Sequence, residues 1–172
     1  MTRRPTPPGE PRVHGGPERI AVGIAEHAVA TNGETLTTSG LGSCVAVALY
    51  DPETDARGLL HAMLPDRDAQ APPTASAAKY VDSGIESLLD RIRKAGGDPT
   101  GLEARLVGGS EMIDLGDDPV GPRNVEAAKA ELEARSIPIV GSDVGGDVGR
   151  TIRFEPDGSL RVRAADGFER TL

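Results

Sequence analysis

The sequence predicts a mixed α/β domain, because two different hydrophobic periods occur along one chain. Residues 45–50 alternate Val45, Val47 and Leu49 with the intervening side chains, which is the two-residue period of a β-strand. Residues 81–92 instead repeat their apolar side chains at spacings of three and four, which is typical of an amphipathic helix. Further strand-like segments lie before and after the helical ones, so we expect strands at both ends of the chain.

The first 18 residues differ in composition from the rest of the chain. They hold five prolines and three glycines with almost no apolar side chains, so burial cannot offset the entropy of ordering them. We therefore expect residues 1–18 to form a flexible tail and residues 19–172 to form one folded domain. A chain of 172 residues is long enough to remove about 70% of its unfolded surface from water.

Apolar periodicity and turn residues predict the other elements. Ile20, Val22 and Ile24 alternate in a first strand over residues 19–30, and a turn at Asn32-Gly33 leads to a second strand over 34–38. Beyond the strand at 45–50 we expect a strand containing His61, a loop at 65–73 and a helix at 74–95 that stops at Gly96-Gly97. A strand at 102–107 should end at the glycines 108–109, and a second helix should follow Pro122 with Asn124 as its cap. A strand at 137–140 and a hairpin of 151–155 with 160–164 complete the expected elements.

The only cysteine, Cys44, follows a glycine-bearing turn and directly precedes the strand at 45–50. Gly40 and Gly42 have no Cβ atom, so the backbone there can adopt a positive φ and leave space for a ligand near the sulfur. A free cysteine is more often a small buried hydrophobe than a nucleophile. Catalysis therefore requires a neighbouring base or positive charge, because a thiol with the ordinary pKa of about 8.5 is mostly protonated at neutral pH.

His61 is the candidate base for Cys44. It lies in the next apolar segment, and the turn-forming residues 51–55 predict a hairpin that brings His61 back beside Cys44. We expect the Cys44 sulfur to lie within hydrogen-bond reach of a His61 nitrogen. If the two groups share a proton, alkylation of Cys44 should persist well below the pH at which an ordinary cysteine stops reacting.

Composition and motifs argue against several classes of function. The net charge is −8, without a cluster of Lys and Arg or an aromatic platform, so we expect no nucleic-acid partner. The glycine pairs lack the residues of nucleotide-binding motifs, and the three histidines with one cysteine lack metal-ligand spacing, so we expect no cofactor and no metal. No apolar run of about 20 residues and no signal peptide is visible, so we expect a cytoplasmic protein without membrane insertion.

Six short motifs stand out along the chain: LGSC at 41–44, GLLHAMLP at 58–65, KY at 79–80, GGSEM at 108–112, RNVEAAK at 123–129 and the glycine pair at 145–146. In this order and spacing they resemble the CheD family of chemoreceptor glutamine deamidases, from about residue 19 to residue 164. The resemblance implies a single-domain, three-layer α/β/β sandwich of the cysteine-hydrolase type, similar to the deamidating bacterial cytotoxins. It also implies methyl-accepting chemotaxis receptors as substrates and a CheC-type phosphatase as a partner.

The resemblance also implies the residues of a catalytic site. By position, the family's nucleophile falls on Cys44, its histidine on His61, and the threonine that orients the imidazole on Thr38. A thiolate suits this reaction, because a carboxamide is a poor electrophile and calls for a better nucleophile than water. The developing oxyanion needs backbone N–H donors, and we expect them in the turn at Gly42 and Ser43.

Two other functions fit the same residues. In the first, the chain is a non-catalytic regulator of chemotactic adaptation that binds a CheC-type phosphatase, and Cys44 is incidental. In the second, Cys44 is a redox-sensing thiol. A regulator should tolerate Cys44→Ser and His61→Ala, whereas a sensor should respond to peroxide without requiring Thr38.

Overall fold

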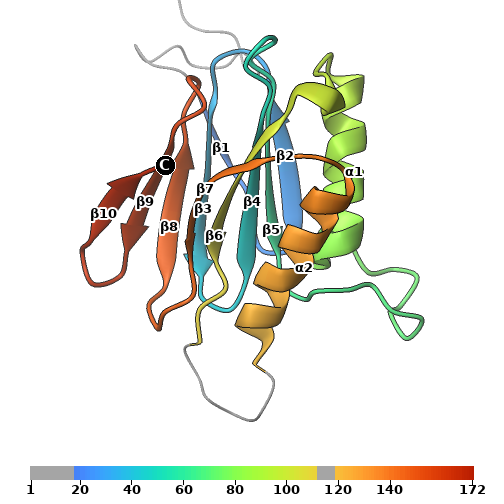
Figure 1. The fold of residues 1–172 in the computed structure, drawn as a ribbon, viewed down its shortest axis with the longest axis vertical. Coiled ribbons are helices and arrows are strands. Elements are labelled where there is room, and N and C mark those ends of the chain that lie inside the picture. The colour runs from blue at the N-terminus through green and yellow to red at the C-terminus, as the bar shows by residue number, and fades with distance from the viewer. Residues whose placement is uncertain (1–17, 112–118) are drawn as a thin grey trace, which may run out of the picture.

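The computed structural model describes residues 18–111 and 119–172, which fold into two five-stranded sheets with two α-helices (Figure 1). Most of the expected tail, residues 1–17, lies outside the described residues. Glu18 belongs to the fold, because its carbonyl oxygen accepts a hydrogen bond from the Thr35 amide at 2.9 Å.

The strands divide between the two sheets without following chain order. In spatial order, the first sheet contains β1 (Arg19–Ala21), β3 (Thr35–Leu41), β8 (Arg150–Phe154), β9 (Leu160–Ala164) and β10 (Glu169–Thr171). The second sheet contains β2 (Glu26–Ala30), β5 (Arg57–Ala62), β4 (Val45–Tyr50), β6 (Glu103–Gly108) and β7 (Ile139–Val144). Neighbouring strands are antiparallel, except that β1 is parallel to β3 and β6 is parallel to β7.

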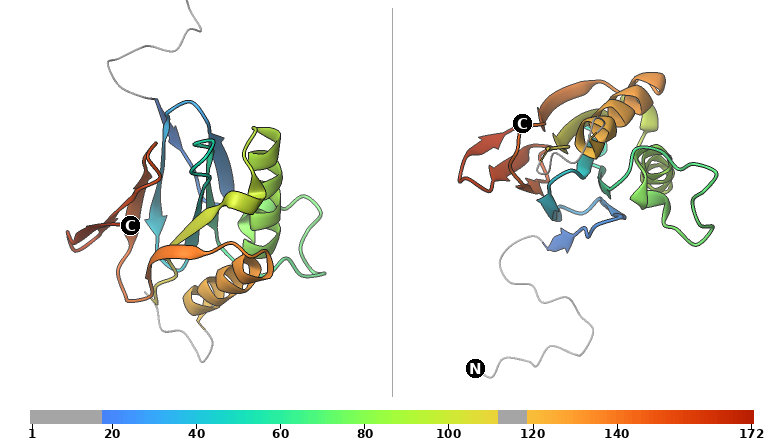
Figure 2. Two further views of the ribbon diagram at one scale, coloured as in Figure 1. Left: turned by 45° about the horizontal axis from the view of Figure 1, so that its top comes forward. Right: turned by 90° about the horizontal axis from the view of Figure 1, so that it is seen from below.

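Both helices cover the same face of the second sheet, so the layers are helices, second sheet and first sheet (Figure 2). They are α1 (Val81–Lys94) and α2 (Val120–Ala134), and short 3₁₀ turns occur at η1 (Ala77–Lys79) and η2 (Pro99–Gly101). The α1 helix stops where the sequence predicts, because Gly96 adopts a φ of +97°, a left-handed conformation that glycine reaches without strain. The three-layer α/β/β arrangement is thus confirmed.

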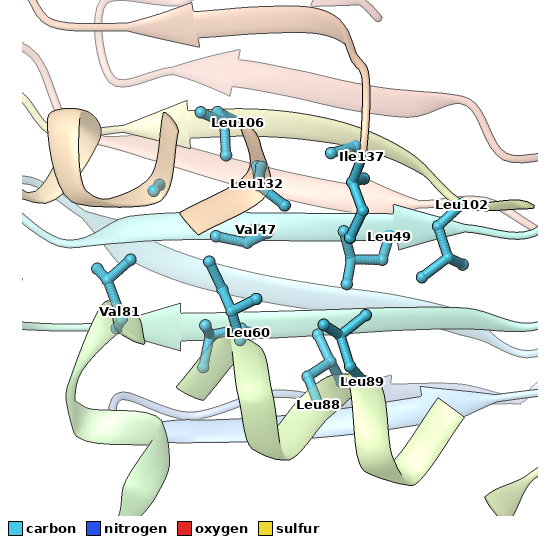
Figure 3. Packing of buried hydrophobic residues seen from close by; sticks show 14 of the residues in the cluster. Val47, Leu49, Leu60, Val81, Leu88, Leu89, Leu102, Leu106, Leu132 and Ile137 are labelled. Atoms are coloured by element: carbon cyan, nitrogen blue, oxygen red, sulfur yellow. The ribbon is translucent and has the colours of Figure 1, made fainter. Parts of the chain in front are cut away.

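Two hydrophobic cores join the three layers. Leu88 of α1 packs toward Leu60 of β5, and Leu132 of α2 packs toward Leu106 of β6 (Figure 3). The other core lies between the sheets and includes Phe154 and the small residues of β4 that face the first sheet. The second sheet is therefore covered on both faces, which is why its central strand β4 is a nearly continuous apolar run.

The segment expected as one strand over residues 19–30 is in fact two strands in different sheets. Ile24 lies in the turn between β1 and β2 and is 55% exposed, although its spacing from Val22 predicts a shared face. The turn contains Ala25 with a φ of +61°, and the Ala25 amide donates to the His61 carbonyl oxygen at 2.9 Å. Alternating apolar residues cannot reveal this turn, because the period continues across it.

Other elements differ from the expected ones mainly at their boundaries. The helix expected over 74–95 is η1 followed by α1, and β7 runs past the expected strand at 137–140 to Val144. The α2 helix begins at Val120, before Pro122, so Asn124 lies inside it and does not cap it. The third strand of the C-terminal region, β10, has no counterpart among the expected elements. None of the helices in the described ranges is long and apolar enough to cross a membrane.

Candidate active site

Thr38 and His61 come from different sheets and meet between them. Thr38 Oγ1 lies 2.7 Å from His61 Nδ1, and the same hydroxyl donates to the Val22 carbonyl oxygen at 2.7 Å. Thr38 is only 4% exposed and His61 is fully buried. The two residues therefore form the contact that the resemblance implies, while their catalytic roles stay a prediction.

These two hydrogen bonds fix the tautomer of His61. A hydroxyl has one hydrogen, and because that hydrogen points to the Val22 carbonyl, the Thr38 oxygen must accept the hydrogen of Nδ1. His61 therefore carries its proton on Nδ1 and has a lone pair on Nε2. Nε2 is buried and has no hydrogen-bond partner among the described residues. It is the nitrogen that is free to act as a base.

Cys44 lies on the same face of the second sheet as His61. Ala46 of β4 pairs directly with His61 of β5, and directly opposite residues of an antiparallel pair share a face. Cys44 precedes Ala46 by two residues and packs against the core between the sheets, so it lies diagonally across from His61. Diagonal neighbours in a sheet are about 7–8 Å apart, a distance that long side chains can span.

The hydrogen bond expected between the Cys44 sulfur and His61 is not formed within the described part of the chain. The diagonal pairing is the physical reason, because the two side chains share a face without being direct cross-strand partners. Catalytic hydrogen bonds are commonly long before substrate binds. Cys44 is partly exposed, unlike the fully buried His61.

Burial favours the neutral form of both groups. It raises the pKa of the Cys44 thiol, an effect that the Cys44 backbone amide partly opposes by favouring the thiolate. It also lowers the pKa of His61. The resting pair is therefore a thiol and a neutral imidazole. The expectation that alkylation persists at low pH requires a thiolate beside an imidazolium, whereas both pKa directions favour the neutral pair.

We expect iodoacetamide to alkylate Cys44 with an inflection above the ordinary cysteine pKa of about 8.5. The sign follows from the direction of the shift: below a raised pKa the thiolate fraction, and hence the rate, is smaller than for a free thiol at the same pH. The measurement is the initial alkylation rate across neutral and alkaline pH, with a small free thiol as the reference. An inflection on the acid side of the reference would instead indicate a resting ion pair.

Residues 42–44, which we call the cysteine turn, are held by three hydrogen-bond donors. The Ser110 amide donates to the Gly42 carbonyl oxygen at 2.9 Å, and the Gly109 amide donates to the Cys44 carbonyl oxygen at 2.8 Å. Asn124 Nδ2 donates to the Ser43 carbonyl oxygen at 2.9 Å. Every carbonyl of the cysteine turn is thus bound from the side of β6 and α2.

The backbone amides of the cysteine turn have fewer partners. The Gly42 amide donates to the Gly40 carbonyl oxygen at 3.0 Å, so it is already used. The Ser43 amide has no acceptor within residues 18–111 and 119–172, and the Cys44 amide has none there beyond its own sulfur. Of the two residues that the sequence suggests for an oxyanion site, Ser43 therefore has a free N–H group and Gly42 does not.

One glycine-based expectation needs correction and another is confirmed. Gly40 has a φ of +71°, as the sequence suggests, but Gly42 is not among the residues with a positive φ. The Gly108-Gly109-Ser110 segment ends β6, as expected, and the amides of Gly109 and Ser110 bind the cysteine turn. This segment therefore holds the backbone around Cys44 in place through hydrogen bonds.

Sequence reasoning gave Asn124 only the role of a helix cap and missed its place beside the site, where it is fully buried. Its Nδ2 donates to the Met63 carbonyl oxygen at 3.0 Å as well as to Ser43. A signal was available, because Asn124, Ala128 and Leu132 are spaced four residues apart and therefore share the inner face of α2. A polar side chain on a buried helix face requires partners, and here they are the two strand ends next to Cys44 and His61.

No cluster of three or more His, Cys, Asp or Glu side chains with the arrangement of a metal site occurs in the described ranges. The chemical groups that lie here are a half-buried thiol, a buried imidazole with a free Nε2, and the backbone amides of Ser43 and Cys44, which bind no backbone oxygen of the described residues. Together they can support attack on a carbonyl carbon, transfer of the thiol proton, and stabilisation of an oxyanion.

The comparisons with known proteins agree on one family. The family model "CheD chemotactic sensory transduction" matches residues 63–164. The probable chemoreceptor glutamine deamidase CheD of Natronomonas pharaonis is 44% identical over 161 residues, which cover 90% of this chain and 93% of the relative. The chemoreceptor glutamine deamidase CheD of Bacillus subtilis is 42% identical over 158 residues, which cover 89% of this chain and 95% of the relative.

One solved structure, the hypothetical protein YfiH of Bacillus licheniformis, is similar with a TM-score of 0.46 and 18% identity, and the match covers 68% of this chain and 49% of that one. The family-model match starts after His61, whereas matches that cover about nine-tenths of the chain include the strands that carry Thr38, Cys44 and His61. On these matches, the chain belongs to the CheD family.

Proposed function

We propose that this protein hydrolyses the side-chain amide of glutamines on methyl-accepting chemotaxis receptors, giving glutamate and ammonia. Cys44 is the nucleophile, His61 the base and acid, and Thr38 the residue that orients the imidazole. The names of the Natronomonas pharaonis and Bacillus subtilis relatives, both chemoreceptor glutamine deamidases, support this substrate. The observation that carries the proposal is the bond from His61 Nδ1 to Thr38, because it leaves Nε2 free on the face that Cys44 shares.

The reaction divides into two halves. In the first, His61 Nε2 takes the thiol proton while the Cys44 sulfur attacks the amide carbon, and the imidazolium then gives this proton to the departing nitrogen. Ammonia leaves and a thioester remains. In the second, Nε2 takes a proton from water, the water oxygen attacks the thioester carbon, and the proton passes to the departing sulfur. Glutamate is released and the thiol is restored.

A neutral resting pair suits this route. The lowered pKa of His61 keeps Nε2 unprotonated to lower pH, so the base is available at the pH of the cell. The raised pKa of Cys44 means that the thiolate forms during attack, when Nε2 receives its proton. The amides of Ser43 and Cys44 are the donors that would bind the oxyanion.

Replacing Thr38 with valine should lower kcat by up to about 10²-fold, a part of the 10²–10⁴ that acid–base catalysis supplies. Valine keeps the shape but removes the acceptor for Nδ1–H, so the imidazole loses its fixed tautomer. Thr38→Ser is the matched control, because it retains the hydroxyl and should retain most of the activity. Steady-state kinetics on a receptor fragment measure both, and equal rates for the Val and Ser variants would remove Thr38 from the mechanism.

The experiment that tests the function uses the cytoplasmic fragment of a cognate receptor, without added metal or nucleotide. Peptide mass spectrometry should find particular glutamines converted to glutamates, with release of ammonia. The control reaction contains the Cys44→Ala chain. If wild type and control give the same glutamine-to-glutamate ratio across several receptors, the deamidase proposal fails and a regulatory function takes its place.

We also propose a CheC-type phosphatase as a partner and the cytoplasm as the compartment. The family resemblance supports the partner, and the receptor substrate supports the compartment. Binding of purified CheC by wild type and by Cys44→Ala separates the two activities, because a regulator needs no nucleophile. Loss of deamidation with CheC binding unchanged in the alanine variant is the expected result.

A further inference from the structure

The ladder between β4 and β5 ends just before the candidate site. Its last pair is Val45 with Ala62, so the residues beyond it, Cys44 and Met63, are not held by the ladder itself. Asn124 crosses this open end. Its Nδ2 donates to the Ser43 carbonyl oxygen at 2.9 Å and to the Met63 carbonyl oxygen at 3.0 Å. Asn124 therefore links the residue just before Cys44 to the residue just after the end of β5, the strand that carries His61.

The direction of the Asn124 carboxamide is set by its partners. Both partners are carbonyl oxygens, which only accept, so the NH₂ group must face them and uses both of its hydrogens there. The carboxamide oxygen is buried without a hydrogen-bond partner in the described ranges. Asn124 is fully buried, and within the described ranges its side chain donates hydrogen bonds to these two carbonyls alone.

Because of peptide geometry, the hydrogen bond from Asn124 to the Ser43 carbonyl also sets the direction of the Cys44 N–H group. In a trans peptide unit the C=O and N–H groups point in opposite directions. The Ser43 carbonyl and the Cys44 N–H belong to one such unit, so Asn124 holds the Cys44 N–H turned away from α2. The Gly42 carbonyl and the Ser43 N–H belong to the preceding unit, which the Ser110 amide holds in the same way.

A second layer of hydrogen bonds supports the donors. The Gly145 amide donates to the Gly108 carbonyl oxygen at 2.9 Å, and the Glu111 amide donates to the Gly146 carbonyl oxygen at 2.8 Å. The loop after β7 therefore fixes the segment whose amides hold the cysteine turn. Asn124 is the one side chain among these donors, so it can be replaced without a change of backbone.

We propose that Asn124 is a positioning residue: it clamps the Ser43 and Met63 carbonyls so that the Cys44 N–H stays directed at the sulfur and the oxyanion position. This inference rests on the proposed function for its kinetic consequence. Its structural part is independent of that function, because the direction of the Cys44 N–H also affects the thiol. That amide favours the thiolate in the folded protein, and loss of the clamp should remove its effect.

The test compares Asn124→Leu and Asn124→Ala with the wild type. Leucine retains the volume without any donor, and alanine removes both. Because Cys44 is the only cysteine, iodoacetamide reports on it alone. The inflection of the alkylation rate should move to higher pH, by an amount on the order of half a pH unit. The alkylation rate at its high-pH plateau reports on access to the sulfur. A turn that merely becomes looser would change this plateau rate and not the pH of the inflection.

On a receptor fragment, kcat should fall about 10- to 100-fold with KM nearly unchanged, because misplaced catalytic groups affect the chemical step more than binding. Ala128→Gly is the matched control, since it weakens the same helix by about 1 kcal/mol without touching the clamp. It should keep the wild-type inflection and kcat. Thermal unfolding identifies an Asn124 variant that fails to fold. In that case the other Asn124 variant alone decides whether the clamp exists.

An alkylation inflection that stays at the wild-type pH in the folded variants overturns the clamp, whatever the rate of deamidation. An upward shift in both variants, with the control unchanged, supports it. If the wild type shows no deamidation of any receptor, the proposed function fails, and the inflection still decides whether Asn124 directs the Cys44 amide.

Discussion

Replacing Cys44 with alanine is expected to abolish receptor deamidation, leaving a rate at least about 10³-fold below the wild type. Alanine has no atom that can form the thioester, so the two-step route is closed. The amides of Ser43 and Cys44 stay in place, because they are backbone groups, and they could support only a slow attack by water. Single-turnover conversion of a receptor fragment, followed by peptide mass spectrometry, measures the loss.

Cys44→Ser provides the second comparison. The hydroxyl is close in size to the thiol, so the fold and the contact with the core between the sheets should be retained. A hydroxyl is a much weaker acid than a thiol, so transfer of its proton to His61 is more difficult and a large loss is still expected. Melting curves that match the wild type would show that lost activity reflects chemistry. A rate within about tenfold of the wild type for Cys44→Ala would contradict the nucleophile assignment.

The placement of Cys44 and His61 on one face of the second sheet could be foreseen from the sequence because it is local, whereas the expected hydrogen bond between them is not formed. Both residues lie in one hairpin with a short turn, and the two-residue period fixes which face each side chain occupies. The α1 helix could be foreseen for the same kind of reason, since its apolar spacing and its terminal Gly96 act within a few residues. Such features need no knowledge of tertiary structure.

The contact of Thr38 with His61 joins two sheets, and no local period predicts it. The family resemblance pointed to Thr38. Its hydrogen bond with His61 Nδ1 depends on how the two sheets pack, which the sequence pattern does not give. The Asn124 contacts are equally distant in sequence, because they join α2 to the ends of β4 and β5. The direction of the Cys44 pKa shift also depends on burial, which a neighbouring histidine in the sequence does not reveal.

Gly108→Ala is expected to destabilise the fold strongly and to disturb the cysteine turn. Gly108 adopts a φ of +109°, and a Cβ atom there would lie 2.3 Å from the Cys44 carbonyl oxygen. That oxygen cannot simply move away, because it accepts the Gly109 amide at 2.8 Å. The backbone strain costs about 1–3 kcal/mol. The overpacking costs about 1–3 kcal/mol more.

The control for Gly108→Ala is Gly33→Ala. Gly33 has a φ of +82°, but a Cβ atom there meets nothing within 4 Å, so this variant carries the backbone strain without the clash. Urea unfolding should therefore give a lower free energy of unfolding for Gly108→Ala than for Gly33→Ala, by the overpacking cost of about 1–3 kcal/mol. Only Gly108→Ala should also slow deamidation, because only its new methyl group pushes on the turn that carries the nucleophile. Equal stability and equal activity of the two variants would show that the Gly108 contact does not support Cys44.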